Sequence, residues 1–208
     1  MSYLPKPYKI ESIKSYTDTV KLFKIKCNLN PAPGTFVEVS IPGIGECPLA
    51  SCSHNKKYLE LLTKNAGNVT SSIFNLKKYD KILIRGPHGH GFPIKDLEGK
   101  NVILIAGGTG IAPITSMINY IEQNKKDFKK IFIYFGFRNE KNILLKERIK
   151  KWEKEFEVHI GLSDDPDSHE HEKGFINKII KHHKPTTKNT IALLCGPEIM
   201  MSVATKEL

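Results

Sequence analysis

The sequence lacks long apolar runs and has few cysteines. No stretch of its 208 residues approaches the roughly 18 apolar residues that a transmembrane helix needs, so no membrane span is expected. The first residues, MSYLPKPYKIES, contain no apolar segment of the kind that a secretory signal requires. The four cysteines are scattered along the chain, which argues against a disulfide framework and favours a reducing, cytoplasmic setting.

Arginine is also scarce, and this limits the interpretation of the basic charge. The formal net charge is +10, yet lysines are spread over the whole chain and the arginines are only Arg85, Arg138 and Arg148. Nucleic-acid-binding proteins generally cluster their basic residues and use arginine for bidentate contacts. The composition therefore argues against nucleic acid as a partner. It favours a solvated lysine-rich surface, or a basic face that attracts an acidic protein partner.

The pattern of the sequence changes near residue 97. Residues 8–97 contain short segments of alternating β-branched and aromatic residues between turn residues, which predict about six strands in a small antiparallel β-barrel. From residue 98, continuous apolar segments such as NVILIAG alternate with helical segments, which predicts a doubly wound α/β domain with a parallel sheet. We therefore predict two domains, residues 1–97 and residues 98–208.

The segment ILIAGGTGIAPI places Gly107–Gly110 between a predicted strand and a predicted helix. Glycines let the backbone turn tightly and bring N–H groups close to a ligand, and a helix N-terminus favours negative charge. The spacing matches neither G-x-G-x-x-G nor a P-loop. The segment therefore predicts either a pyrophosphate site at the carboxyl edge of the sheet or a purely structural turn.

Two further segments have similar properties. LLCGPEIM places Cys195 at the end of another predicted strand, where it would either face the same crevice or be a buried core cysteine. GNVTSSIF opens a short predicted helix, where Gly67, Val69 and Thr70 would place N–H groups and a hydroxyl on a second phosphate group.

The predicted barrel followed in order by G-x-V-T, R-G-P-x-G, A-G-G-T-G-I-A-P and C-G-P resembles the ferredoxin–NADP⁺ reductase superfamily over nearly the whole chain. Within it, the sequence is similar to gamma subunits of cytoplasmic sulfhydrogenases, the B subunit of anaerobic sulfite reductase and the electron-transfer subunit of dihydroorotate dehydrogenase. The resemblance implies FAD on the barrel and a nicotinamide dinucleotide on the α/β domain. It implies hydride transfer to the flavin and single-electron transfer to an iron–sulfur protein or another subunit of a complex.

The resemblance also assigns cofactor-binding roles to short segments of this chain. Two segments of the barrel domain would hold FAD: Leu62, Thr63 and Lys64, and Gly67, Val69 and Thr70. Two loops of the α/β domain would hold the dinucleotide, the second beside the nicotinamide: Gly108, Thr109 and Gly110, and Cys195, Gly196 and Pro197. For the 2′ position of the dinucleotide, Asp164 would repel a phosphate and favours NADH, whereas Arg138 would favour NADPH.

The superfamily's flavin motif, Arg-x-Tyr-Ser, is altered in this sequence. Aligned on Pro48, it has Cys47 for the arginine, Leu49 for the tyrosine and Ala50 for the serine that bonds flavin N5. Ala50 has no hydroxyl, so Ser51 or the backbone would have to substitute. We therefore take Ala50, Ser51 and Cys195 as the residues nearest the redox chemistry. A slow or differently tuned flavin is one consequence to expect.

The resemblance also predicts what this chain lacks. The related electron-transfer subunits continue with a last strand and a cysteine-rich segment that holds a [2Fe–2S] cluster. This sequence ends at Leu208 without four closely spaced cysteines. We therefore expect an α/β domain lacking its last strand and no cluster in this chain, which would be a shortened version, a fragment, or a subunit whose cluster lies elsewhere.

The histidine-containing segments predict no metal site. GPHGHGFP is explained by its turn glycines, DDPDSHEHEK by a solvated loop, and His182 and His183 by the dipole at a helix end. Trp152 and its Ile/Leu neighbours are interpreted as core. The alternative to an active oxidoreductase is a non-catalytic or regulatory subunit that keeps the fold but has lost productive flavin chemistry, since Ala50 and the missing cluster segment both fit that hypothesis.

Overall fold

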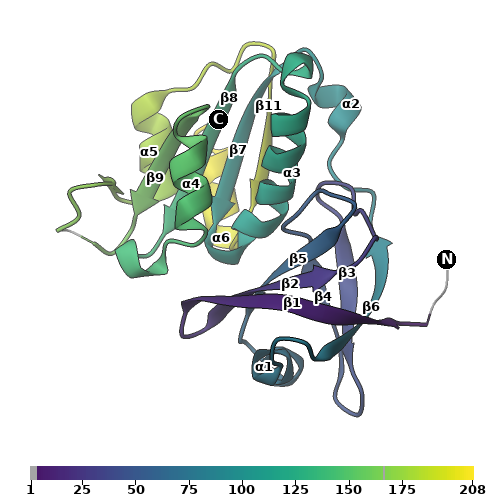
Figure 1. Ribbon diagram of the computed structural model, residues 1–208. Coiled ribbons are helices and arrows are strands. Elements are labelled where there is room, and N and C mark those ends of the chain that lie inside the picture. Colours follow the sequence, from purple (N-terminus) through teal and green to yellow (C-terminus); the bar gives the residue numbers. More distant parts are fainter. Residues whose placement is uncertain (1–3, 166) are drawn as a thin grey trace. The chain divides into compact units, whose positions relative to one another are not determined.

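The computed structural model describes residues 4–165 and 167–208, which form two compact units. One unit contains the described residues up to Phe92 together with Thr115–Tyr120, and the other contains Pro93–Ile114 and Ile121–Leu208. Figure 1 shows the strands and helices of both units. The domain boundary after residue 97 stays a prediction.

The first unit contains a six-stranded antiparallel sheet in the order β4-β3-β6-β1-β2-β5, as the alternating pattern predicts. Every second side chain of a strand points to the same face, and residues such as Ile10, Phe23 and Val39 form a fully buried core inside the sheet. The strands are β1 (Lys6–Thr17), β2 (Val20–Lys26), β3 (Phe36–Ile41), β4 (Gly45–Ala50), β5 (Tyr58–Lys64) and β6 (Lys81–His88).

The edge strands β4 and β5 meet and close the sheet into a barrel. Directly after β4, Ser51 forms a bridge to Leu61 of β5, and the Cys52 N–H donates to the Glu60 carbonyl at 2.8 Å. Helix α1 (Asn68–Asn75) follows β5 and packs Ile73 into the barrel core. Closure leaves no exposed sheet edge at this seam, and it fixes the direction in which the residues after Ala50 point.

The second unit contains a five-stranded parallel sheet in the order β10-β9-β8-β7-β11, which confirms the predicted doubly wound fold. Four of its strands were predicted from their apolar runs, while the two-residue strand β10 was not. The strands are β7 (Asn101–Gly107), β8 (Ile131–Phe137), β9 (Glu157–Leu162), β10 (Glu172–Lys173) and β11 (Thr190–Cys195). The helices are α2 (Ile94–Leu97), α3 (Ile111–Gln123), α4 (Lys146–Trp152), α5 (Ile176–His183) and α6 (Glu198–Thr205), with the short 3₁₀ turns η1 (Gly108–Gly110), η2 (Lys125–Asp127) and η3 (Glu140–Asn142).

Helices cover both faces of this parallel sheet. On one face, Ile105 and Tyr134 pack with Ile179 of α5 and Ala204 of α6 in a single buried cluster. On the other face, the ring of Phe135 lies 6.0 Å from Trp152 of α4, and Trp152 is almost fully buried. The interpretation of Trp152 as a core residue is confirmed.

Candidate functional site

The carboxyl ends of β7 and β11 bring two glycine-containing loops side by side. The two strands are parallel neighbours in register, with Cys195 opposite Ala106. β7 continues into the 3₁₀ turn Gly108–Gly110 and then α3, and β11 continues through Gly196 into α6. Two segments that lie almost 90 positions apart in the sequence therefore form one edge, where ligands of open parallel sheets bind.

The close approach of these loops depends on Gly110. A Cβ atom on Gly110 would overlap the Cys195 carbonyl oxygen, and would lie 2.6 Å from the Cys195 carbonyl carbon and 2.8 Å from the Cα of Gly196. Backbone cannot yield as the end of a side chain can, so this position excludes every residue except glycine. Gly108 has φ +53° and open space around it, and it is exposed. The turn thus combines a tightly packed glycine with one that leaves the backbone accessible.

Helix α3 begins at this edge directly after the 3₁₀ turn, and the N–H of its first residue, Ile111, bonds back to the carbonyls of Gly108 and Thr109. Gly110, the N-cap residue of α3, has no side chain to cap the helix, and the first turn of α3 has no acidic residue. The first N–H groups of a helix have no partner within the helix and carry partial positive charge. These features fit the pyrophosphate of a dinucleotide, with Thr109 half-buried between the two glycines.

Cys195 is a half-buried thiol beside this loop. Burial raises its pKa, so the group stays protonated near neutral pH rather than forming a thiolate nucleophile. The neighbouring Gly196 is half-buried and Pro197 is exposed. The structure therefore gives Cys195 the properties of a neutral contact for a ligand, and its role beside the nicotinamide stays a prediction.

Arg138 and Asp164, the two residues with opposing predictions for the 2′ position, pair with each other. Arg138 follows β8 and Asp164 follows β9, and the Arg138 Nε donates to Asp164 Oδ2 at 2.9 Å. The Asp164 N–H also donates to the Arg138 carbonyl at 2.7 Å. Both side chains are more than half exposed, so the pair is weak and a ligand can reach either partner.

The turn into α1 is held by the side chain of Thr70. Its Oγ1 accepts hydrogen bonds from the N–H groups of Ala66 at 2.9 Å and Gly67 at 3.0 Å, and donates to the Gly67 carbonyl at 3.0 Å. The predicted direct contact of this hydroxyl with phosphate therefore competes with its role in holding the turn. Val69 packs its side chain against the barrel core, so its N–H is the group it offers to a phosphate.

The side chains of β4 alternate between two faces. Cys47 and Leu49 pack against the barrel core, while Pro48 is exposed and Ala50 is half-buried. Burial, assisted by the charge of Glu38, raises the pKa of the Cys47 thiol, so it is no substitute for a cationic arginine. On the outer face, β4 presents the side chains of Glu46, Pro48 and Ala50.

The side chain of Ser51 faces the interior of the barrel. Its side chain is fully buried, and its Oγ donates to the Ser53 carbonyl at 2.7 Å and accepts from the Ser53 N–H at 3.2 Å. The bridge that closes the barrel turns this residue inward, which the sequence alone does not reveal. The hydroxyl of Ser51 is thus unavailable as the donor that Ala50 lacks, and only the backbone of this segment remains for that role.

The predicted flavin-lining segment of β5 also divides between two faces. Thr63 follows Leu59 and Leu61 on the inner face of the barrel, and it is fully buried with no hydrogen-bond partner for its Oγ1 among the described residues. Leu62 and the exposed Lys64 lie on the opposite face. The three residues therefore do not form one surface: Leu62 is also buried, and Lys64 is the exposed one.

Sequence reasoning missed Met200. Its side chain lies against both glycine loops, because a Cβ on Gly107 would overlap the Met200 sulfur and a Cβ on Gly196 would lie 2.7 Å from its Cε. The signal was available in the sequence, since Met200 lies four residues after Gly196 and so on the inner side of the first turn of α6. The Met200 side chain therefore packs against both loops.

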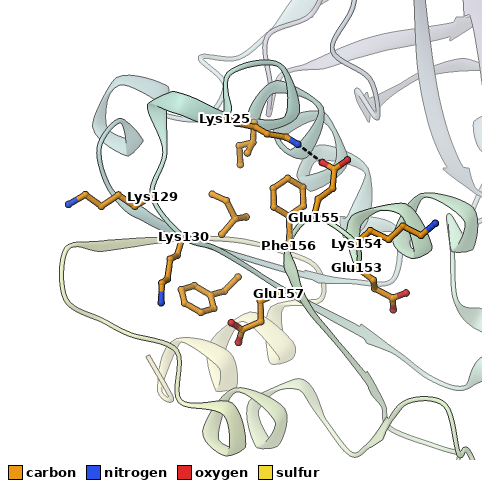
Figure 2. A pocket seen from close by; sticks show the side chains of 11 residues that line it. Lys125, Lys129, Lys130, Glu153, Lys154, Glu155, Phe156 and Glu157 are labelled. Carbon is orange, nitrogen blue, oxygen red and sulfur yellow. Dashed lines mark hydrogen bonds and ion pairs between the residues drawn. The ribbon is translucent and has the colours of Figure 1, made fainter.

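A separate hollow of about 470 Å³ lies at the opposite end of the same sheet. It is formed where β8 and β9 begin, and it is lined by Lys130, Phe156 and Glu157 among others (Figure 2). Figure 2 shows several of its charged side chains directed away from the hollow, and Lys125 instead pairs with Glu155 at 2.6 Å. Dinucleotides bind at the carboxyl ends of such strands, so we do not assign this hollow to the cofactor.

Known proteins resemble this chain in both sequence and structure. The family described as the oxidoreductase NAD-binding domain matches residues 104–206. Sulfhydrogenase 2 subunit gamma of Pyrococcus furiosus is 33% identical over 96% of this chain and 77% of its own length. The probable dihydroorotate dehydrogenase B (NAD⁺) electron transfer subunit of the same organism is 33% identical over 93% of this chain and 70% of its own length.

The fold agrees with these relatives. A ferredoxin–NADP⁺ reductase from Neisseria gonorrhoeae, solved with bound FAD and NADP, superimposes with a TM-score of 0.83 at 18% identity, covering 98% of this chain and 89% of that one. The similarity extends over the barrel and the parallel sheet together, as the order of the motifs predicts. The chain has a ferredoxin–NADP⁺ reductase-like fold, and it belongs to the family that includes sulfhydrogenase gamma subunits and dihydroorotate dehydrogenase B electron-transfer subunits.

Proposed function

We propose that this protein is a flavin-dependent NAD(P)H oxidoreductase that passes electrons between a nicotinamide dinucleotide and an iron–sulfur partner through FAD. One observation carries the proposal: the glycine-only contact of Gly110 with the backbone of Cys195 and Gly196. A contact of this kind keeps side chains out of the carboxyl edge of the sheet, where a dinucleotide must approach the backbone closely.

The residues present fit both cofactors, but the flavin site lacks the side-chain donor that the superfamily motif has at the position of Ala50. When bound, the flavin supplies the step between two-electron and one-electron chemistry. The loop Gly108–Gly110 and the start of α3 would bind the dinucleotide pyrophosphate, and Cys195 would contact the nicotinamide with a protonated thiol. The first N–H groups of α1 would bind the FAD pyrophosphate in the turn that Thr70 holds, and Leu62 and Lys64 would contact the flavin.

Three finer features belong to the same proposal. Asp164 offsets the charge of Arg138, which favours NADH over NADPH. The relatives named as subunits of a sulfhydrogenase and of dihydroorotate dehydrogenase B support a complex with further subunits, and we place the iron–sulfur cluster on one of them rather than on this chain. No helix among the described residues is long and apolar enough to cross a bilayer, and the scattered free cysteines support our placement of the protein in the cytoplasm.

The test is the colour of the purified protein and its response to NADH. We expect flavin absorbance that bleaches when NADH is added under anaerobic conditions, and that bleaches more slowly with NADPH. Reduction of an added one-electron acceptor should then follow. A protein that neither retains nor takes up FAD would overturn the proposal and leave a non-catalytic subunit of the same fold, the hypothesis to which Ala50 and the inward-facing Ser51 point.

A further inference from the structure

Three side chains from separate elements converge at the outer edge of the parallel sheet. They are His159 of β9, Glu172 of β10 and His183 at the end of α5, and each offers one ligand atom within 4.8 Å of the other two. His159 Nδ1 lies 3.3 Å from Glu172 Oε1. His183 Nε2 lies 2.8 Å from both carboxylate oxygens of Glu172.

The fold explains why these residues meet. Glu172 pairs with Gly161 in the parallel register of β10 and β9, and His159 lies on the same face of β9 as Gly161. A Cβ on Gly161 would lie 2.9 Å from Ile179 of α5, so the missing side chain lets this helix approach closely. The last residue of α5 then reaches the carboxylate that β10 presents.

A second carboxylate lies behind His159. The other ring nitrogen of His159, Nε2, is 3.2 Å from Glu157 Oε1. In metal sites a histidine ligand commonly donates its second N–H to a carboxylate, which fixes the ring and its tautomer. Glu157 is placed to do this for His159, whose other ring nitrogen, Nδ1, faces Glu172.

Tyr134 provides an independent observation at the same place. It is fully buried and stacks on His159 with a ring-centroid distance of 5.1 Å, and its hydroxyl has no hydrogen-bond partner among the described residues. A buried polar group without a partner is costly, and this one belongs to the ring that packs on His159.

We propose that His159, Glu172 and His183 bind a divalent transition-metal ion of the Zn²⁺ type. Two imidazoles and one carboxylate are a ligand set that zinc uses, leaving the fourth position for water. The two imidazole rings lie next to each other, with a centroid distance of 3.6 Å. The partial negative charge at the end of α5 adds to the attraction.

The ion acts as a clamp on a weakly held part of the domain. β10 has two residues and two register pairs with β9, so little else in the sheet fixes this strand. Bound metal joins β9, β10 and α5 through their side chains. It thereby restrains both ends of the segment between β9 and β10, which includes Asp164.

A neighbouring group of Glu140, Glu170 and His171 is a weaker candidate. Its ligand atoms also lie within 4.8 Å of one another, but His171 Nε2 is 3.7 Å from Glu140 Oε2 and Glu140 Oε1 already accepts from the Ser168 hydroxyl at 2.8 Å. Glu170 is exposed. The experiment therefore also tests whether Zn²⁺ binds to this second group.

The experiment is calorimetric titration of the full chain with Zn²⁺ after treatment with a chelator and desalting. We expect one saturable site per chain that Glu172→Gln and His183→Asn abolish, and an affinity that Glu157→Gln lowers by about 10-fold to 100-fold. The matched control is His182→Asn, because His182 is the exposed neighbour of His183 and should leave the affinity unchanged. X-ray absorption at the zinc edge should show nitrogen and oxygen ligands without sulfur.

Circular dichroism of each variant separates loss of the site from loss of the fold. If His183→Asn does not fold, the melting temperature of the wild-type chain decides, because a ligand of the native state raises it with concentration. The proposal is overturned if wild-type protein shows neither saturable binding nor a Zn²⁺-dependent melting temperature. It is also overturned if binding survives Glu172→Gln but is lost in Glu140→Gln.

Discussion

The turn Gly107–Gly110 of the parallel sheet and the turn at Gly67 of the barrel differ in what holds them. The first is fixed by backbone packed on backbone, since Gly110 touches Cys195 and Gly196 where no Cβ fits. The second has open space around Gly67 and is held by the hydroxyl of Thr70. The difference teaches that two helix starts proposed to bind pyrophosphate depend on different chemistry, one on the absence of side chains and the other on a single side chain.

The largest expected effect comes from adding one methyl group to the tighter turn. In Gly110→Ala, the Cβ displaces the backbone of Cys195 and Gly196, and a shift of about 1 Å in a binding loop lowers turnover by about 100-fold. Steady-state kinetics with NADH should show this loss while the flavin content stays at the wild-type level.

The matched control for that change is Gly67→Ala. Nothing lies within 4 Å of a Cβ at Gly67, and its φ of 179° is extended backbone that any residue adopts. We expect a free energy of unfolding within about 0.5 kcal/mol of wild type. Equal effects of the two alanines on folding and on turnover with NADH would show that the two turns do not differ as described.

The second effect tests the turn that depends on a side chain. Thr70→Val keeps the shape but removes the oxygen that accepts two backbone N–H groups, and the loss of such a cap costs about 1 kcal/mol. We expect the affinity for FAD to fall by about five-fold, measured by flavin fluorescence during titration of the deflavinated protein. Thr70→Ser retains the oxygen and should bind FAD as wild type does; a weak Thr70→Ser variant would contradict this account.

The two sites also differ in how far the sequence predicts them. The loops of β7 and β11 follow from apolar runs that end in glycine, because neighbouring parallel strands place their carboxyl ends together. The barrel site depends on the direction of side chains after β4, and that direction is set by the bridge of Ser51 to Leu61. A bridge between positions ten residues apart leaves no pattern in the sequence, so the inward turn of Ser51 could not be predicted.

The remaining surprises have the same cause. Arg138 and Asp164 were each identified from the sequence, but their ion pair requires the register of β8 against β9. His159, Glu172 and His183 lie on three elements, one of which is a strand of two residues that is too short to have any periodicity. Contacts set by tertiary register therefore mark the limit of prediction from this sequence.

The third effect concerns the hydroxyl group that is absent at Ala50. Ala50→Ser places a hydroxyl on the outer face of β4, where the superfamily motif has one. A hydrogen bond is worth about 0.5–1.5 kcal/mol, so we expect flavin reduction by NADH to accelerate by about 2-fold to 10-fold in stopped-flow measurements.

Ser51→Ala is the internal comparison for that variant. Its hydroxyl bonds the Ser53 backbone in the interior, so its removal should lower the free energy of unfolding by about 1 kcal/mol and leave the rate of flavin reduction unchanged. If Ser51→Ala accelerated flavin reduction, or if Ala50→Ser did not, we would conclude that the backbone already supplies the missing donor.

The smallest expected effect concerns the pair between Arg138 and Asp164. Because both side chains are mostly exposed, Asp164→Asn should change the free energy of unfolding by less than about 0.5 kcal/mol. The freed guanidinium should attract a 2′-phosphate, so the KM for NADPH should fall by about 3-fold to 10-fold while the KM for NADH changes little, and added salt should reduce the gain. The double variant Arg138→Gln with Asp164→Asn should lose this gain, because the cation that attracts the phosphate is then absent. A gain that persists in the double variant would place recognition of the 2′ position elsewhere on the parallel sheet and leave the ion pair a purely local contact.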